Sequence, residues 1–311
     1  MLKDRILATL KFFDLQDYPL TLLELHQFLL EEPEKLRQLV GLDWELVESA
    51  AVRPSPPVEA GQILSCLETE CQGLVDNFHG FYHFLGRESL VRQRQASCLW
   101  AIKREKLIRR FIGKLKDLPF VRGVGLTGSQ ALGQQKKDSD IDLLIITDAR
   151  FMWLCRTLVT AYFQMLGLRR HDHKVVNRFC LNHYLAGAIP LKELRNLYTA
   201  MEYIKLRPLV YKDKIAEFQA QNSSWMRQVF PTWQPFGETA EPQGLLQRSL
   251  EKIFNNRFGL FLESMLKRWQ LPRIKKEEFI LVKADELSFH PGSRQQSLLA
   301  EFFSPGSNFL K

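Results

Sequence analysis

The sequence predicts an α+β protein in which a central mixed β-sheet with flanking helices lies between a small N-terminal domain and a helical C-terminal region. Three observations support this fold class. Residues 1–86 show helical periodicity that ends in a hairpin pattern, and residues 119–187 alternate between strand and helix patterns. Helical periodicity returns over 188–311, and 87–118 has the pattern of one connecting helix. We therefore expect four parts with these boundaries.

The composition is that of a globular protein. The 311 residues are 45% hydrophobic and 25% charged, so a sizeable core is expected. The net charge of +8 favours anionic partners such as nucleotides or nucleic acid. The five cysteines are scattered and include no C-x-x-C pair, which argues against a disulfide framework or a zinc site. There is no signal-peptide pattern and no apolar run near the ~18 residues of a membrane span, so we expect a cytoplasmic protein without membrane contact.

The N-terminal region begins with helices and ends with a hairpin. Apolar residues recur at helical spacing over 3–14 and again over 60–73. Thr21 and Glu24 have the spacing of a capping box at the start of another helix. The stretch "GLVDNFHGFYHFLG" then places two short apolar-aromatic runs around a turn. This order predicts a winged helix, which binds DNA in some proteins and contacts only proteins in others.

Residues 87–118 predict a long basic helix that ends at Pro119. Its charged face is either a solvated surface or a track for nucleic acid. The apolar residues expected to be buried are Leu90, Leu99, Ile102, Leu107, Phe111 and Leu115. The basic residues are Arg92, Arg94, Lys103, Arg104, Arg109, Arg110, Lys114 and Lys116.

The stretch "GVGLTGSQALGQQKKDSDIDLLIIT" contains two competing signals. Gly123, Gly125 and Gly128 form the G-x-G-x-x-G of dinucleotide-binding proteins. That motif needs a long helix after the glycines and an acidic residue about twenty positions further on. Here the polar loop "GQQKKDSD" interrupts the helix, and two carboxylates follow only twelve and fourteen residues after Gly128. The dinucleotide interpretation is therefore set aside.

The second signal is a glycine–serine turn followed by two acids on a strand. Gly128 lets the backbone approach a ligand closely, and Ser129 offers a hydroxyl at a helix start that suits a phosphate. Asp140 and Asp142 alternate with apolar residues of the strand "SDIDLLIIT", so both point to one face. Ile141, Leu143 and Ile145 pack on the other face. Two adjacent carboxylates indicate a divalent cation such as Mg²⁺.

This arrangement resembles the nucleotidyltransferase superfamily of DNA polymerase β, kanamycin nucleotidyltransferase and the minimal nucleotidyltransferases. Its hallmark is G-S, about ten residues, and D-x-D among apolar residues, here Gly128, Ser129, Asp140 and Asp142. The resemblance implies a nucleotidyltransferase core, an NTP substrate with ATP as the expected donor, and Mg²⁺ or Mn²⁺. It assigns the glycine and the serine to nucleotide binding and the two aspartates to metal binding and catalysis. The stretches "FFDLQDYPLTLLEL", "GFYHFLGRESLVRQR" and "NLYTAMEYIKLRPLVY" also resemble an uncharacterised bacterial family that joins a winged helix to such a domain.

The third carboxylate of this superfamily lies on a following strand, and here its expected position holds Asn182 in "VVNRFCLNHYLAG". We expect Asn182 in the catalytic site, although an amide carries no charge and cannot act as a base. Asp172 or His183 could replace the missing base. Arg156 could reach a triphosphate, or it could be an ordinary helix-face charge.

The main functional hypothesis is a Mg²⁺-dependent nucleotidyltransferase that moves a nucleoside monophosphate from an NTP to an unidentified protein, nucleic acid or small molecule. The alternative is a nucleic-acid-binding regulator whose nucleotidyltransferase domain senses nucleotide and is catalytically weakened. A third interpretation, an antitoxin-like modifier of a partner protein, rests on the spacing typical of the minimal group.

Overall fold

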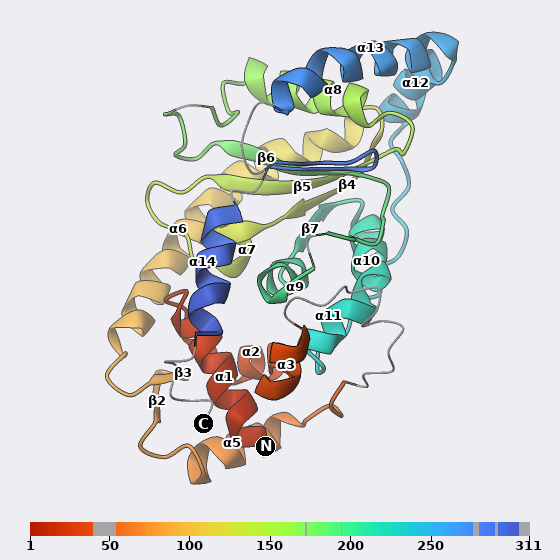
Figure 1. The fold of residues 1–311 in the computed structure, drawn as a ribbon. Helices are drawn as coiled ribbons and strands as arrows, with labels where there is room; N and C mark the ends of the chain where they lie inside the picture. Colours follow the sequence, from red (N-terminus) through yellow and green to blue (C-terminus); the bar gives the residue numbers. More distant parts are fainter. Residues whose placement is uncertain (40–53, 172, 194, 276–279, 290–291, 305–311) are drawn as a thin grey trace.

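The computed structural model describes residues 1–39, 54–171, 173–193, 195–275, 280–289 and 292–304. A six-stranded mixed sheet crosses the molecule, with helices on both of its faces and the N-terminal elements beyond one helical layer (Figure 1). Among the described residues, no helix combines the length and the apolar character that crossing a bilayer requires.

The central sheet has the strand order β7-β4-β5-β6-β9-β8. The strands are β4 Val121–Leu126, β5 Ile141–Thr147, β6 Phe179–Ala186, β7 Arg207–Val210, β8 Leu281–Val282 and β9 Glu286–Ser288. Strands β5 and β6 are parallel because helix α8 (Met152–Met165) crosses between them, and the other pairs are antiparallel. The sequence did not predict β7, β8 and β9, since two to four residues are too few to show alternation.

Each face of the sheet has its own core. Ile141, Leu143 and Ile145 pack with α8, while Leu144 and Ile146 pack with the helices of the other face, as alternation predicts. The helices of these two layers are α9 Leu197–Ile204, α10 Lys212–Gln221, α11 Ser223–Val229 and, next to α8, α13 Arg257–Ile274 (Figure 1). The acidic motif therefore lies on a strand that is anchored from both sides.

The N-terminal region contains four described helices and a three-stranded antiparallel sheet of order β1-β3-β2. Their bounds are α1 Leu2–Asp14, β1 Leu20–Thr21, α2 Leu22–Gln27, α3 Pro33–Leu39, α5 Ala60–Thr69, β2 Val75–Phe78 and β3 Phe81–Phe84. The hairpin is present, and Thr21 and Glu24 form the expected capping box. These elements follow the order of a winged helix, a classification that stays a prediction.

Two features of this region argue against a nucleic-acid surface. Residues 54–86, which form α5 and the hairpin, contain no Lys or Arg, whereas they include Glu59, Glu68 and Asp76. Affinity for the phosphate backbone of a nucleic acid comes mainly from basic side chains. The N-terminal helices also share a hydrophobic core with α9–α11, and the rings of Phe28 and Phe230 lie 5.7 Å apart. The region is therefore built as a packing unit against the rest of the chain.

The basic helix is present as α6 and a short 3₁₀ helix, at Ser89–Ile112 and Gly113–Asp117. Leu99 and Ile102, expected to be buried, are exposed, because the helix packs through a different face. On that face Arg94 pairs with Glu24 at 2.6 Å, and the buried Arg104 donates to the carbonyl of Lys137 at 2.8 Å. Two basic residues of the supposed track thus point inward.

The C-terminal half contains a helix break that the sequence analysis missed. The periodicity of residues 243–270 predicts one long amphipathic helix, but the structure has α12 (Leu245–Phe254) followed by α13. The side chain of Asn256 accepts from the backbone N–H groups of Phe258 and Gly259, and so it caps a new helix. The last described helix is α14 (Gly292–Phe302).

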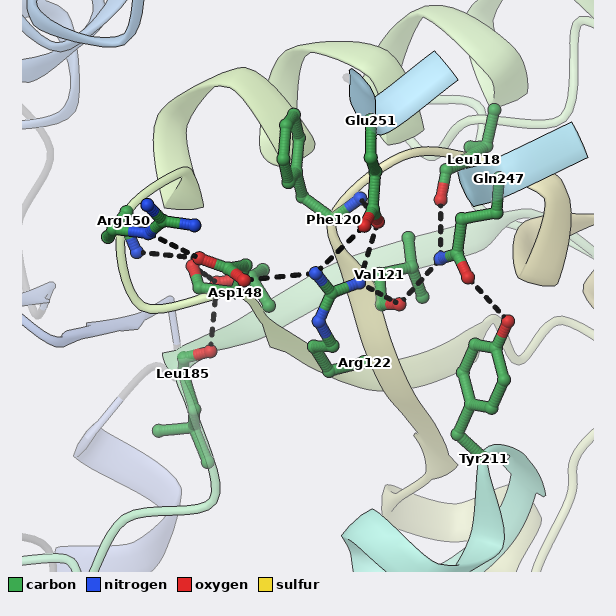
Figure 2. A network of polar contacts seen from close by, with 11 residues as sticks. Leu118, Phe120, Val121, Arg122, Asp148, Arg150, Leu185, Tyr211, Gln247 and Glu251 are labelled. Carbon is green, nitrogen blue, oxygen red and sulfur yellow. Dashed lines mark hydrogen bonds and ion pairs between the residues drawn. The ribbon is translucent and has the colours of Figure 1, made fainter. Parts of the chain in front are cut away.

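A polar network fixes α12 to one end of the β4–β5 pair (Figure 2). Arg122 of β4 contacts Asp148 at 2.9 Å and Glu251 of α12 at 2.6 Å. The Tyr211 hydroxyl donates to Gln247, whose amide in turn donates to the main-chain carbonyls of Leu118, before β4, and Val121, its first residue. This end of the pair has its charges matched within the fold.

Candidate active site

A cavity of about 420 Å³ opens at the other end of the β4–β5 pair. Its lining includes all five residues singled out from the sequence, namely Gly128, Ser129, Asp140, Asp142 and Asn182. The remaining wall comes from α6, α9, α14, the loop after α1, the loop before β5, and from Arg170 and Phe289. The volume lies within the range of small-molecule sites.

Gly128 is required by its contact with the acidic strand. It opens the short helix α7 (Gly128–Leu132) with a φ of +62°, which favours glycine. A Cβ at this position would overlap the carboxylate of Asp142. Gly125, by contrast, lies within β4, where Leu206 packs against its backbone. The glycines of the G-x-G-x-x-G pattern therefore serve packing and the turn, which agrees with setting the dinucleotide interpretation aside.

Ser129 is oriented by a buried amide. The side chain of Gln135, which is 0% exposed, donates to the Ser129 hydroxyl oxygen at 2.7 Å. With its oxygen accepting that bond, the hydroxyl can direct its own proton into the cavity. The neighbouring Gln134 donates to the carbonyl of Gln16 at 2.9 Å, so the N-terminal region stabilises the loop between α7 and β5.

The two aspartates converge on the cavity. Ligand atoms of Asp140, Asp142 and Cys180 all lie within 4.8 Å of one another. Arg170 donates to Oδ2 of Asp140 at 2.7 Å, and the Asn182 amide donates to Oδ1 of Asp142. Burial, and then the charge of Asp140, raise the pKa of Asp142 to about 7. The fold thus holds a carboxylate pair whose mutual repulsion it does not fully offset.

A bulge in β6 decides which side chain lies third around this pair. Asp142 is opposite Cys180, but Leu144 is opposite His183, so β6 carries one extra residue. Asn182 lies two residues after Cys180, shares its face, and donates to Asp142. His183 is 1% exposed and lies between the Tyr203 hydroxyl and a buried glutamate, at 3.0 and 2.8 Å, so the interpretation of His183 as the base is wrong. Asp172, the other candidate, lies outside the described residues.

Cys180 belongs to the site although the sequence analysis did not select it. Its thiol donates to Oδ1 of Asn182 and so turns the amide nitrogen toward Asp142. Burial, and then the charge of Asp142, raise the pKa of this thiol to about 12, which keeps it neutral. A neutral thiol is a poor ligand for Mg²⁺. The two-residue spacing in the strand "FCLN" was the available signal, since alternate residues share a face.

Glu202 is the second residue that the sequence analysis missed. It lies on α9, is only 5% exposed, and lines the cavity together with Tyr198. Its negative charge contributes to the raised pKa of Asp142. Lys136 and Arg170 line the same cavity and supply positive charge. The only sequence signal for Glu202 was an acid inside the apolar helix "LYTAMEYI".

The comparisons with known proteins agree with this geometry. Residues 108–186 match the family model described as nucleotidyltransferase domain. The matched segment contains β4, α7, β5, α8 and β6, and with them the turn and both aspartates. No curated protein and no solved structure gives a significant match to the chain.

Proposed function

We propose, from the premise that residues 108–186 form a nucleotidyltransferase domain, that the chain transfers a nucleoside monophosphate from an NTP to an acceptor hydroxyl. The observation that carries this proposal is the convergence of Asp140 and Asp142 beneath the Gly128–Ser129 turn in one cavity. ATP is the expected donor. The bond that breaks joins the α-phosphorus to the oxygen leading to the β-phosphorus, and pyrophosphate leaves.

The donor set suits Mg²⁺ or Mn²⁺. Arg170 and Asn182 each engage one oxygen of an aspartate, which leaves the second oxygen of Asp140 and of Asp142 as a hard ligand. A divalent cation at this position would also stabilise the ionised carboxylate of Asp142, whose pKa is raised by burial and by the charge of Asp140. Such an ion supplies charge neutralisation for the transferred phosphoryl group.

The remaining residues of the cavity have roles that follow from their chemistry. Gly128 and Ser129 contact the β- and γ-phosphates, while Lys136 and Arg170 balance the charge of the triphosphate. Asn182 acts through Asp142 as a positioning residue, because its amide holds one carboxylate oxygen. Catalysis of this kind rests mainly on positioning and on charge stabilisation.

Glu202 is our candidate for the base. Position 182 holds an amide where the superfamily has a carboxylate, so the strand supplies no group that could take the proton of the acceptor hydroxyl. Glu202 reaches the same cavity from α9 and supplies a third carboxylate from outside the sheet. A carboxylate in a largely enclosed site suits proton transfer.

The proposal is tested by labelling with α-³²P-ATP, Mg²⁺ and a cell extract as the source of acceptor. Asp142→Asn should abolish transfer of label, whereas Asp138→Asn, the same change on an exposed residue outside the cavity lining, should leave it intact. Persistence of label with Asp142→Asn would reject the site. Binding of Mg²⁺-ATP, followed by calorimetry, gives a readout that needs no acceptor.

Glu202→Gln separates the base from the nucleotide site. This change keeps the shape of the side chain and removes its proton affinity, so transfer should fall at least a hundredfold while Mg²⁺-ATP binding stays within twofold. An equal loss of binding and transfer would instead assign Glu202 to the nucleotide site.

A further inference from the structure

A second cavity, of about 520 Å³, adjoins the active site on the α8–α13 side of the sheet. It lies where α8 and α13, which pack side by side (Figure 1), approach the start of β6. Arg170, Asn182 and Phe289 line both cavities, so the two spaces share a wall. We call this space the arginine cavity.

The lining of the arginine cavity is strongly basic. Arg156, Arg169, Arg170 and Arg273 line it, and within the described part of the chain the lining contains no aspartate or glutamate. The guanidinium of Arg156 donates to the neutral amide of Gln270. Arginines gathered in a concave site attract oxyanions, and their planar geometry suits phosphate oxygens in particular.

Aromatic rings accompany these arginines. Arg273 lies 4.1 Å from the ring centroid of Trp269, which is 55% exposed, and Arg156 lies 5.2 Å from that of Phe289. All four residues line the cavity. Exposed aromatic and guanidinium planes stack with nucleobases, and arginines bind the phosphates attached to them. This combination fits a base together with a phosphate better than it fits a simple anion.

The position of the cavity gives its ligand a role. Asn182 lines both cavities and donates to Asp142, and Cys180, which donates to Asn182, also lines the arginine cavity, so a molecule bound there is separated from Asp142 by one side chain. Arg156, considered from the sequence as a triphosphate ligand, lines this second cavity and not the first.

We propose that the arginine cavity binds the acceptor and that the acceptor is a nucleoside phosphate, either free or at the end of a nucleic acid strand. This inference rests on the proposed function. The acceptor hydroxyl oxygen forms a bond to the α-phosphorus of the NTP, the bond from that phosphorus to the bridging oxygen breaks, and pyrophosphate leaves with the electron pair. The hydroxyl proton passes to the Glu202 carboxylate.

The test measures binding to the second cavity while the first is filled. Adenosine 5′-monophosphate and a 5′-phosphorylated ten-nucleotide single strand are titrated onto the full chain in the presence of Mg²⁺ and saturating α,β-methylene-ATP. Arg273→Gln combined with Arg169→Gln should weaken binding at least tenfold, while affinity for the ATP analogue stays within twofold. Arg273 is exposed and Arg169 half-buried, so the fold should persist, and unchanged thermal unfolding verifies this.

Arg268→Gln is the matched control, because Arg268 is an exposed arginine of the same helix outside the cavity lining. It should leave both affinities unchanged. Binding of the mononucleotide supports a free acceptor, and binding of the strand alone supports a strand end. Failure of both probes to bind, or equal binding by the double variant, would overturn the inference. Because the readout is binding without turnover, such a failure is distinct from loss of transfer in Asp142→Asn.

Discussion

The two ends of the β4–β5 pair carry polar clusters of opposite character. At one end Arg122 contacts Asp148 and Glu251, and Arg150 also contacts Asp148, so two cations and two carboxylates form one network (Figure 2). At the other end Asp140 and Asp142 lie side by side, with only Arg170 supplying an opposite charge at hydrogen-bond distance among the described residues. The same two strands thus hold a charge-matched cluster, in which the carboxylates have cationic partners, and an unmatched cluster, in which two carboxylates lie together.

The difference teaches where stability and function reside. A buried charge costs free energy unless a partner offsets it, and Arg122 and its two carboxylates meet that requirement within the fold. Asp142 does not, since its pKa is raised to about 7. A shift of this kind, caused by burial and a like charge in a cavity, is typical of a site completed by a ligand.

The largest expected effect comes from Asp142→Asn. Transfer should fall by at least about 10³-fold, equivalent to roughly 4 kcal/mol, while the free energy of unfolding without metal stays equal or rises because a like charge is removed. Urea unfolding in EDTA measures the second quantity. Saturating Mg²⁺ should raise the melting temperature of the unaltered chain and not that of the variant. If Asp142→Asn lost stability as well as activity, the distinction between a stabilising end and a functional end of the strand pair would be contradicted.

Arg122→Leu tests the matched end. It leaves Glu251 without its cationic partner and Asp148 with only the exposed Arg150 nearby, and both carboxylates are largely buried, so the free energy of unfolding should fall by about 3 kcal/mol. Transfer per folded molecule should not change. Arg150→Leu is the control, because the Arg150 side chain is 58% exposed and its guanidinium lies 3.6 Å from Asp148, and the change should cost less than about 0.5 kcal/mol. Equal losses in both variants would show that the network is not specific.

Local sequence patterns predicted the end of the β4–β5 pair that holds Asp140 and Asp142, but not the end that holds the Arg122 network. The site depends on local spacing, because a strand brings Asp140 and Asp142 to one face and the preceding turn lies next to them in the antiparallel pair. The network joins Arg122 to Glu251, which are 129 residues apart. No local pattern connects them, and the break before Asn256 that ends α12 was also missed.

Within the site, the residues that the sequence did not predict owe their positions to tertiary structure, which no local sequence pattern reveals. Alternation from Cys180 places Asn182 beside Asp142, whereas the bulge in β6 brings His183 to the α9 side of the sheet, where it contacts Tyr203 outside the cavity lining. Glu202 reaches the cavity only because α9 packs across the sheet, an arrangement that the helical pattern of its own segment does not reveal. Strand β9, which pairs with β6 beside the site, has three residues and therefore no readable period.

Glu24, Arg94 and Lys205 form a second charge-matched cluster, and its contribution to stability should depend on pH. Burial alone would raise the pKa of Glu24, but the hydrogen bond from Arg94 and the charges of Arg94 and Lys205 outweigh it and lower that pKa to about 2. A lowered folded-state pKa gives stability that is present above the unfolded value near 4.5 and is lost as pH falls toward 2. This contribution is on the order of 2–3 kcal/mol.

Unfolding of the unaltered chain and of Glu24→Gln between pH 6 and pH 2.5 measures that contribution. The stability difference between them should be largest near pH 6 and should shrink as the solution becomes more acidic. Comparing the two proteins removes the effect of other carboxylates such as Glu31, whose pKa is also lowered. A difference that stays constant with pH would show that Glu24 acts through packing alone.

The smallest expected effect is that of Tyr211→Phe at the matched end. Its buried hydroxyl donates to Gln247 and lies 3.1 Å from the carbonyl of Lys116, so the change removes about one net hydrogen bond and should lower the free energy of unfolding by about 1 kcal/mol. Transfer and nucleotide binding should not change, because Tyr211 and the Gly128–Ser129 turn lie at opposite ends of the sheet pair. Urea titration with a parallel transfer assay measures both quantities. A tenfold loss of transfer at normal stability would mean that the two ends are coupled and that the division between a stabilising end and a functional end is wrong.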